Sequence, residues 1–505
     1  MTYIPVVTAQ EMRKIEKLAI KEGGNEEVFM RQAGLQVGSY ALEWIGRHSL
    51  PRRVTLLIGK GNKGGDAYAA GIYLLQNGIR VRALHIEPPH NCSPLNQLLS
   101  TEFVRAQGHL ELITPEVPLE FEGEGLIIDG FLGTGFQGEV QFPLSMAIGA
   151  ANISGVPILA IDIPSGLDAT TGEVKGIAIQ ATETITLGMF KSGLVLRDGW
   201  NYTGRIQCKN FGLAPQYFSQ VEAIAHIPTK KTLASYLPPI VRNRHKYQAG
   251  YVVGFSGSKI FKGAPKIAGL ASLRSGAGIV RIFHKEEIGP SPDPLICQLW
   301  NKKEWEEEKK RAGALFLGPG CGDKIAFLRK EIPLIQNPLV VDADAIQKEI
   351  SYPKQTILTP HRGEVLRLLG LKKTPSEEDL LALCHKWAHR TQCILVLKGA
   401  PTWIFSKNSP PVLIPHGDPG MAKAGMGDAL TGIIAALLAQ KATPLHAAIL
   451  GVSLHAIAGE KGALQKSSYS LLPGDLIECL PQAIMEHGAR MVRFIPFHKT
   501  DNSFF

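Results

Sequence analysis

The sequence predicts an α/β protein of two three-layer domains in series, each a parallel sheet wrapped by helices. Short β-branched runs alternate with helical stretches over residues 54–187 and again over residues 250–397. Such alternation is typical of strand–helix–strand units whose strands lie parallel. A glycine-rich loop follows the first of these strands, and a second glycine-rich segment begins a helix near the C-terminus. Ligands bind at such places in α/β folds.

Length and composition place the domain boundary. A chain of 505 residues exceeds the size of one ordinary hydrophobic core, and two domains are the simplest division. Residues 213–245 combine four prolines with the basic stretch Arg242–Lys246 and show weak periodicity. We therefore expect domains at residues 1–225 and 226–505.

The individual elements follow from periodicity. Residues 9–46 predict a helical layer, because Met12, Ile15 and Ala19 recur at helical spacing. Strands are expected at Val54–Ile58, Ile79–Ile86, Leu126–Asp129, Pro157–Ile161 and Ala181–Leu187, then at Gly250–Phe255, Gly278–Phe283, Ala314–Leu317, Leu339–Asp342, Thr356–Leu358 and Ile394–Leu397. Helices are expected at Ala67–Gln76 and Ala429–Gln440.

Composition restricts the classes of function. No apolar run reaches the roughly 18 residues of a membrane span, and no leader pattern is visible, so we expect a cytoplasmic protein without a membrane partner. Seven scattered cysteines without a CxxC pair predict reduced structural thiols. The net charge of +9 comes from dispersed residues without a nucleic-acid-binding motif. Anionic small ligands or a plain solvated surface both explain it.

The first glycine-rich segment runs from Gly59 to Asp66 between a predicted strand and helix. Free N–H groups and the helix dipole favour an anion there. The spacing also fits G-x-G-x-x-G, with Glu87 after the second strand, so an ordinary dinucleotide dehydrogenase is one alternative. A tight strand-to-helix turn without a ligand is another.

Two later strands end in aspartates. Asp129 and Asp162 each follow an apolar run, and Gly133 and Gly135 permit close backbone approach. Because parallel strands collect ligands at their carboxyl ends, these loops and the first one predict a common pocket. Each carboxylate could hold a cation, orient a ligand or act as a base, and helix capping is the structural alternative.

The second glycine-rich segment ends in Gly425-Met-Gly427-Asp428 at the start of an apolar helix. Glycines before a helix leave N–H donors free for a developing phosphoryl charge, and Asp428 in the first turn can accept a proton from a neighbouring hydroxyl. This pattern predicts phosphoryl transfer. Helix capping by Asp428 is the alternative.

Taken together, residues 8–215 resemble the NAD(P)H-hydrate epimerase domain, also called the YjeF N-terminal domain, which implies a Rossmann-like fold. The resemblance implies catalytic roles for Asp162 and Lys191 and a potassium ion held by Asp129 and Ser165. The residues that it implies around the hydrated nicotinamide nucleotide are Asn62, Lys63, Gly64, Gly65, Asp66, Gly133, Thr134, Gly135, Phe136, Gln137, Gly138, Glu139 and Asp162.

One departure concerns the cation. The family motif Gly-Asn-Asn-Gly-Gly-Asp-Gly has a potassium-binding Asn where this chain has Lys63, and Ala67 replaces the last Gly. Because an ammonium and K⁺ carry the same charge, Lys63 could place its own cation beside Asp129. The alternative is a solvent-pointing Lys63 with potassium retained.

The Gly-x-Gly-Asp helix start resembles the ribokinase-like superfamily, in which the Asp activates the acceptor hydroxyl. Within that superfamily, residues 228–490 look like the NAD(P)H-hydrate dehydratase domain. Seven ordered motifs carry this resemblance: His245–Gly250, Gly263–Ala264, Leu273–Gly278, Leu317–Gly320, Val341–Ala345, Leu358–Glu364 and Leu397–Thr402. Arg362, Ala424 and Met426 depart from the usual Pro, Gly and Ser, and Met426 could narrow the anion loop.

The resemblance also implies residue roles in the second domain. Lys398, Gly399, Ala400, Pro401, Thr402 and Gly427 would contact ADP, and Ala264, Gly320, His361 and Asp428 would face the hydrated nicotinamide. Asp342 and Asp344 end an apolar strand, where Mg²⁺ ligation and capping are both open. His361 has an alternative as a satisfied structural histidine in a tight loop.

The implied activity is the repair of NADHX and NADPHX, the hydrated forms of NADH and NADPH. The first domain would interconvert the R and S hydrates, and the second would dehydrate the S form with ADP and Mg²⁺, giving AMP and phosphate. An ATP-dependent small-molecule kinase, a hydride-transferring dehydrogenase and a non-catalytic first domain are the alternatives. We expect no nucleic-acid partner and a homo-oligomer, although no segment argues for a particular assembly, and the preference between ADP and ATP stays open.

Overall fold

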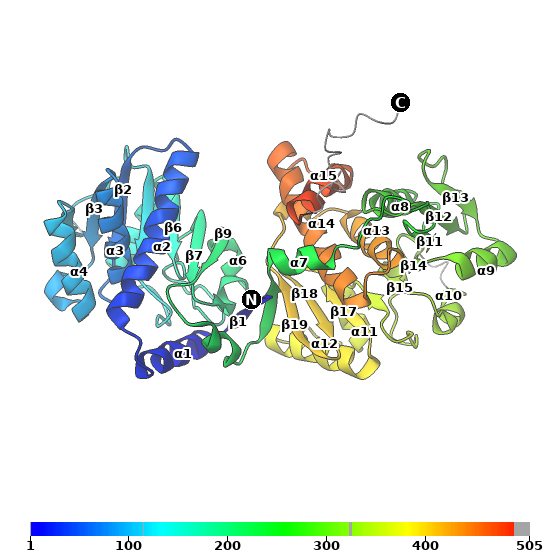
Figure 1. Ribbon diagram of the computed structural model, residues 1–505, viewed down its shortest axis with the longest axis horizontal. Helices are drawn as coiled ribbons and strands as arrows, with labels where there is room; N and C mark the ends of the chain where they lie inside the picture. The colour runs from blue at the N-terminus through cyan, green and yellow to red at the C-terminus, as the bar shows by residue number, and fades with distance from the viewer. Residues whose placement is uncertain (1, 115, 323–325, 489–505) are drawn as a thin grey trace, which may run out of the picture. The chain divides into compact units, whose positions relative to one another are not determined.

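The computed structural model describes residues 2–114, 116–322 and 326–488. The chain divides into two compact units (Figure 1). The N-terminal unit comprises Ile4–His226, and the C-terminal unit begins at Ile227 and includes Tyr3. Each unit is built on a largely parallel sheet, so the predicted α/β class is confirmed.

The N-terminal unit contains a seven-stranded sheet in the order β4-β3-β2-β5-β6-β7-β9. All neighbouring strands in it pair in parallel. The strands are β2 (Arg53–Ile58), β3 (Arg80–His85), β4 (His109–Leu112), β5 (Leu126–Gly130), β6 (Ile158–Ile161), β7 (Glu183–Leu187) and β9 (Arg205–Lys209). Separately, β1 (Tyr3–Val7) pairs in parallel with β8 (Phe190–Lys191).

Helices cover both faces of this sheet. They are α1 (Ala9–Lys21), α2 (Glu26–Arg47), α3 (Asn62–Gln76), α4 (Pro94–Arg105), α5 (Leu144–Ile153) and α6 (Gly199–Tyr202). Leu56 and Ile128 pack in the core formed with α1 to α4, whereas their neighbours Leu57 and Ile127 pack in a second core with α5. Since successive strand residues point to opposite faces, the unit has three layers.

The strands of the C-terminal unit run in the order β13-β12-β11-β14-β15-β16-β17-β18-β19. Pairing is parallel from β13 to β17, and the β18–β19 hairpin adds antiparallel strands. The strands are β11 (Tyr251–Phe255), β12 (Ile279–His284), β13 (Ile296–Leu299), β14 (Ala314–Leu317), β15 (Leu339–Val341), β16 (Ile357–Leu358), β17 (Ile394–Leu397), β18 (Thr402–Ser406) and β19 (Ser409–Ile414). Strand β10 (Ala225–Pro228) lies where the units adjoin in sequence.

Helices also cover both faces of this second sheet. They are α7 (Lys230–Tyr236), α8 (Gly263–Arg274), α9 (Lys302–Arg311), α10 (Leu328–Glu331), α11 (Arg362–Leu369), α12 (Glu377–Thr391), α13 (Met426–Ala439), α14 (Pro444–Lys466) and α15 (Pro473–Glu486). The almost wholly buried α13 packs with α8, α14 and α15 in one core that includes Val252. On the other face, Trp305 of α9 makes edge contacts with Phe255 and Phe283.

The eleven predicted strands are present, but two predicted helix starts are wrong. Helix α13 begins at Met426 and not at Ala429. Helix α3 begins at Asn62 and not at Ala67, after an extended Gly61. The sequence predicts these glycines in a loop, yet Gly64 and Gly65 are helical. Close packing at both positions leaves no room for a larger residue. A Cβ on Gly64 would lie 2.3 Å from the Gly59 carbonyl oxygen, and one on Gly65 would lie 2.4 Å from the Met30 sulfur.

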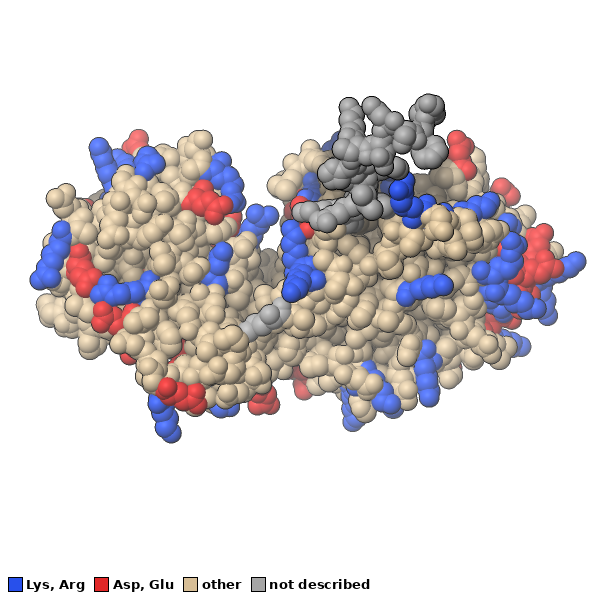
Figure 2. Space-filling view, in the orientation of Figure 1, with Lys and Arg blue, Asp and Glu red and all other residues tan. Residues whose placement is uncertain are grey.

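The surface matches the dispersed charge in the sequence. In the face shown in Figure 2, basic and acidic side chains of the described residues are interspersed and form no continuous basic surface. None of the helices in the described part of the chain is long and apolar enough to cross a membrane. All seven cysteines are free.

The contact between α2 and α3 predicts a stability effect. A Cβ on Gly34 of α2 would lie 2.2 Å from the Ala69 Cβ of α3, whereas one on Gly46 of the same helix would meet nothing within 4 Å. Gly34→Ala should therefore lower the free energy of unfolding of the N-terminal unit by about 1–3 kcal/mol. Gly46→Ala is the matched control, and helix propensity should make it neutral or up to about 1 kcal/mol stabilising. Denaturant unfolding checks both, and equal effects would contradict the packing argument.

Candidate functional site

A cavity of about 830 Å³ lies at the carboxyl ends of the strands of the N-terminal unit. Residues that follow β2, β3, β5 and β6 line it, and α1 and α2 contribute Arg13, Glu16, Glu26 and Met30. The predicted convergence of the glycine-rich loop with the Asp129 and Asp162 loops is therefore observed, because parallel strands end at one edge of their sheet.

The structure brings most of the predicted substrate residues to this cavity. Those that line it are Asn62, Lys63, Asp66, Gly133, Thr134, Gly135, Phe136, Glu139 and Asp162. Gly64 and Gly65 instead face the interior contacts described above. Gln137 and Gly138 are exposed in the loop after β5 and are not among the lining residues.

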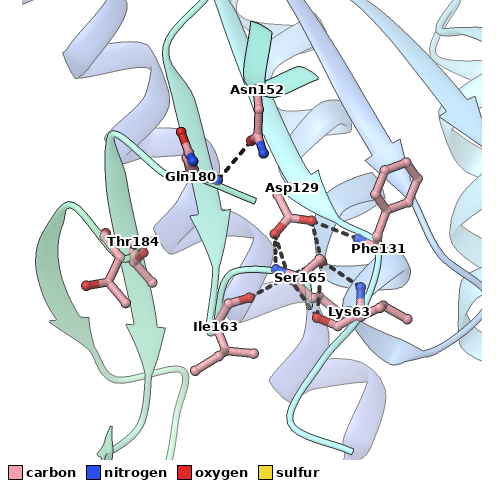
Figure 3. Close-up of polar contacts among 10 residues, drawn as sticks. Lys63, Asp129, Phe131, Asn152, Ile163, Ser165, Gln180 and Thr184 are labelled. Atoms are coloured by element: carbon pink, nitrogen blue, oxygen red, sulfur yellow. Dashed lines mark hydrogen bonds and ion pairs between the residues drawn. The ribbon is translucent and has the colours of Figure 1, made fainter. Parts of the chain in front are cut away.

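Lys63 lies in the first turn of α3, and its side chain is buried with 5% exposed. Its Nζ donates to Asp129 Oδ2 at 2.9 Å, to the carbonyl oxygens of Leu132 at 3.0 Å and Ile163 at 2.7 Å, and to Ser165 Oγ at 3.1 Å (Figure 3). The side chain does not point to solvent. Burial lowers the pKa of Lys63, and the Asp129 carboxylate opposes that shift.

Asp129 is fully buried at the end of β5 and accepts from every side. Oδ1 accepts from Phe131 N at 3.1 Å and Ser165 Oγ at 2.5 Å, and Oδ2 accepts from Ser165 N at 2.8 Å and from Lys63. The potassium ion implied by the family resemblance does not fit this arrangement. The oxygens of Asp129 and Ser165 that were expected to hold it already surround the Lys63 ammonium.

Asp162 lines the cavity with 18% of its side chain exposed and pairs with the buried Lys191, which is not among the lining residues. Lys191 Nζ bonds to the Asp162 carboxylate and donates to the Leu187 carbonyl oxygen at 2.5 Å. Leu187 N donates to Asp162 Oδ1 at 2.9 Å. Asp162 also has a φ of +63°, a conformation that non-glycine residues adopt at a cost and that recurs at functional sites. The pair can hold or move a proton at the cavity wall.

Sequence reasoning missed the contribution of α1. Burial raises the pKa of Glu16 to about 7; the Lys191 ammonium opposes this shift, and the Asp162 carboxylate adds to it. Burial also raises the pKa of Asp66, followed by repulsion from Asp162 and Glu16. Glu16 lies one turn after Met12 on the buried side of α1, so a carboxylate beside that apolar face was the available signal.

In the C-terminal unit, Asp428 lies in the first turn of α13, behind Gly425 with a φ of +94°. Lys398 Nζ contacts Asp342 Oδ1 at 2.7 Å, and Thr431 Oγ1 donates to Asp342 Oδ2 at 2.9 Å. A Cβ on Gly427 would lie 3.2 Å from Lys398 Nζ. Gly427 therefore lies beside a lysine in the first turn of α13, where backbone N–H groups have no helical partners, and such a donor set suits an anion.

The carboxylates around this helix start perturb one another. Burial, followed by repulsion from Asp342, raises the pKa of Asp428 to about 6. Burial acts to lower the pKa of Lys398, but Asp342 and Glu364 outweigh it and raise that pKa. A carboxylate with a raised pKa next to a lysine that stays charged suits general-base chemistry near neutral pH.

The other predicted residues of this unit have defined places. Ala264 and Gly320 are adjacent, since a Cβ on Gly320 would lie 2.8 Å from the Ala264 Cβ. His361 caps α11 through a reciprocal bond pair with Glu364, and 56% of its side chain stays exposed. Gly399, Ala400, Pro401 and Thr402 connect β17 to β18 next to Lys398.

Two expectations about the phosphate-binding side change. The Met426 side chain is buried in the core packed around α13, so it does not narrow the anion loop. Asp344 Oδ2 accepts from Gly322 N at 2.7 Å, and both Asp342 oxygens are engaged. Within the described ranges, no group of three or more His, Cys, Asp or Glu side chains is arranged to hold a metal ion.

Comparison with protein families gives two matches. Residues 26–193 match the family described as YjeF-related protein N-terminus, and residues 252–482 match the family described as NAD(P)H-hydrate dehydratase.

Whole-length relatives show both parts in one chain. A bifunctional NAD(P)H-hydrate repair enzyme of Moorella thermoacetica is 31% identical over 95% of this chain and 96% of its own. One of Coxiella burnetii is 32% identical over 92% of this chain and 96% of its own. Among solved structures, the ADP/ATP-dependent NAD(P)H-hydrate dehydratase of Bacillus subtilis is 28% identical, with a TM-score of 0.47, and the match covers 51% of this chain and 97% of the other.

The raised pKa of Glu16 predicts a pH dependence of stability. A carboxyl with a pKa of about 7 in the folded unit, against an ordinary 4.5, contributes stability below pH 4.5 that is lost as the pH rises through about 7. Raising the pH across that range should therefore destabilise the wild type relative to Glu16→Gln by at most about 3 kcal/mol. Chemical denaturation at both ends measures it. Glu43→Gln, which replaces an exposed carboxylate of α2, controls for the lost charge; a Glu16→Gln difference that is constant with pH would contradict the assignment.

Proposed function

Since the chain belongs to the family of bifunctional NAD(P)H-hydrate repair enzymes, we propose that it restores hydrated NADH and NADPH through two activities on one polypeptide. The N-terminal unit interconverts the R and S hydrates. The C-terminal unit dehydrates the S hydrate with ADP and releases NAD(P)H, AMP and phosphate. Together they convert both epimers.

The dehydratase part of the proposal rests on the position of Asp428 in the first turn of α13. Asp428 takes the proton of the ring hydroxyl, and that oxygen attacks the terminal phosphoryl group of ADP, so that AMP leaves. The carbon–oxygen bond of the resulting phosphate ester then breaks, and phosphate leaves with the bonding electron pair. Loss of a ring proton restores the double bond. Phosphate is a far better leaving group than hydroxide. The pKa of about 6 leaves Asp428 unprotonated at neutral pH, as a base must be.

The neighbouring residues position and neutralise the phosphates. The helix start at Gly427 has free N–H groups, and Lys398, fixed by Asp342, adds a positive charge beside them. The Asp342 and Asp344 carboxylates are already engaged with protein donors, so we expect a Mg²⁺ ion to enter with the ADP phosphates, where it would supply further charge neutralisation. These groups act by orientation and electrostatics, which dominate phosphoryl transfer.

The epimerase part rests on the Asp162–Lys191 pair at the cavity of the N-terminal unit. Asp162 faces the cavity, and the buried Lys191 holds its carboxylate in place. A hydrated nicotinamide in the cavity would meet the Asp162 carboxylate, which can exchange a proton with its hydroxyl group, and Lys191 lies behind that carboxylate. Glu16 and Asp66, whose pKa values are raised mainly by burial, supply further proton-accepting groups along the same wall.

Two further points remain predictions of the sequence: a cytoplasmic location and a homo-oligomeric state. Neither alters the chemistry proposed for the two sites, since each site is built from residues of one unit.

A mixture of R and S hydrates tests the proposal. With ADP and Mg²⁺, the wild type should convert the whole mixture to NAD(P)H, followed by the absorbance of the reduced nicotinamide and by the free phosphate released. Asp428→Asn should slow dehydration by about 10²–10⁴-fold, the range of general-base effects, and leave epimerisation intact. The reaction of the Asp162→Asn variant should stop when the S hydrate is consumed, because the R hydrate is no longer converted to it.

Asp379→Asn, which changes an exposed first-turn aspartate of α12, is the control for the Asp428 substitution. Release of a phosphorylated product in place of free phosphate would replace this proposal by a small-molecule kinase. Conversion of neither hydrate by the wild type would overturn it.

The pH profile of dehydration gives an independent check. A base with a pKa of about 6 loses activity as it takes up a proton, so kcat/KM should fall about tenfold per pH unit below pH 6 and level off above it. Initial rates between pH 4.5 and 8 measure this limb. The residual activity of Asp428→Asn should not show this fall below pH 6. A fall that persists in that variant would assign the titration to another group.

A further inference from the structure

The Lys63 ammonium occupies a site made entirely of oxygen acceptors. Asp129 Oδ2, the Leu132 and Ile163 carbonyl oxygens and Ser165 Oγ lie 2.7–3.1 Å from Nζ (Figure 3). They come from the end of β5 and the loops after β5 and β6. Carbonyl and carboxylate oxygens of this kind also bind potassium in place of water. The environment therefore selects a monovalent cation, and a side chain of the protein supplies it.

The site requires a positive charge. Asp129 is wholly buried, and an isolated carboxylate in the interior is strongly unfavourable unless it is paired and hydrogen-bonded. Its three other donors are the Phe131 and Ser165 N–H groups and the Ser165 hydroxyl, all of them neutral. Lys63 is the cation within hydrogen-bonding distance of Asp129 in the described residues, so the charge balance of this strand end depends on it.

A separate potassium ion has no place beside the ammonium. An ion bound by the same four oxygens would overlap Nζ, and one displaced from them would face a like charge in a buried setting. Gly133 lies against the Lys63 stem, with an ideal Cβ 3.6 Å from the Lys63 Cβ, and packs that side of the side chain.

We propose that Lys63 is a built-in replacement for a bound potassium ion, so that the N-terminal unit folds and works without potassium. The catalytic clause rests on the proposed epimerase function, whereas the binding clause does not. A covalently attached cation is present at all ionic conditions. It also fixes the start of α3 to the Asp129 and Ser165 loops, which shape the cavity.

Cation binding by the full-length wild type is the first test. Thallium(I), a potassium mimic, should show no saturable binding at this site by ²⁰⁵Tl NMR, and the unfolding midpoint of the N-terminal unit should be equal in KCl and NaCl at matched ionic strength. Epimerisation rates in the two salts should agree within twofold. Saturable thallium binding that protects the N-terminal unit from unfolding, or an epimerisation rate that needs potassium, would overturn the proposal.

The matched variants are Lys63→Asn and Lys17→Asn. Lys63→Asn removes the ammonium and opens its oxygen site, so the unfolding midpoint should fall in NaCl and recover by several degrees in KCl, and thallium should now bind. Epimerisation by this variant should drop at least tenfold in NaCl and recover in KCl. Lys17→Asn removes an exposed positive charge from α1, outside the residues that line the cavity, and should respond to the two salts as the wild type does.

The two readouts separate this inference from the function it adjoins. If no epimerisation is found in either salt, the proposed epimerase fails, but equal wild-type midpoints with potassium-dependent recovery of Lys63→Asn still support a tethered cation. If Lys63→Asn is equally unstable in both salts, the oxygen site is not a cation site and the inference fails. If that variant does not fold at all, the thallium measurement on the wild type decides alone.

Discussion

The buried charge of Asp129 is the constraint on which the N-terminal site depends. Breaking a buried ion pair typically costs about 3–5 kcal/mol, because one charge is left without compensation. Here the compensating ammonium comes from α3, and the same atom binds the loops that follow β5 and β6. A substitution of Lys63 would therefore change both the charge balance at Asp129 and the shape of the cavity wall.

The C-terminal unit solves a similar problem in a similar way. Asp342 directly follows β15, is 1% exposed, and pairs with Lys398, which directly follows β17. Each unit thus places a buried aspartate at the carboxyl end of a parallel strand and neutralises it with a lysine from a neighbouring element. In the first unit the lysine completes an internal cation site, and in the second it stands beside the glycine-rich helix start. The same pairing therefore serves a structural purpose in one site and anion binding in the other.

Both proposed sites contain a group whose proton affinity is changed by burial. Glu16 and Asp428 both have raised pKa values, and burial is the leading cause in each case. Asp428 lies at a helix start, where backbone N–H groups are free to bond and a buried polar group can keep partners, whereas Glu16 lies within α1.

The sequence by itself determined the parallel α/β class, the eleven strands of the sheet interiors, and the place of Asp428 at a helix start, because periodicity and glycine spacing are local properties. Edge strands such as β4 and β13 were not predicted, since short half-exposed strands with polar residues lack a clear local pattern. The β18–β19 hairpin was not predicted either, although β18 is mostly buried and β19 ends in a buried apolar run. The start of α3 at Asn62 was missed because glycines disfavour helices, and only contacts with Gly59 and Met30 explain their presence. The direction of the Lys63 side chain was left open by the sequence, and Glu16 was not identified from it. Tertiary structure decided both, because only the folded chain brings α1, α3 and the strand ends together and buries their charges.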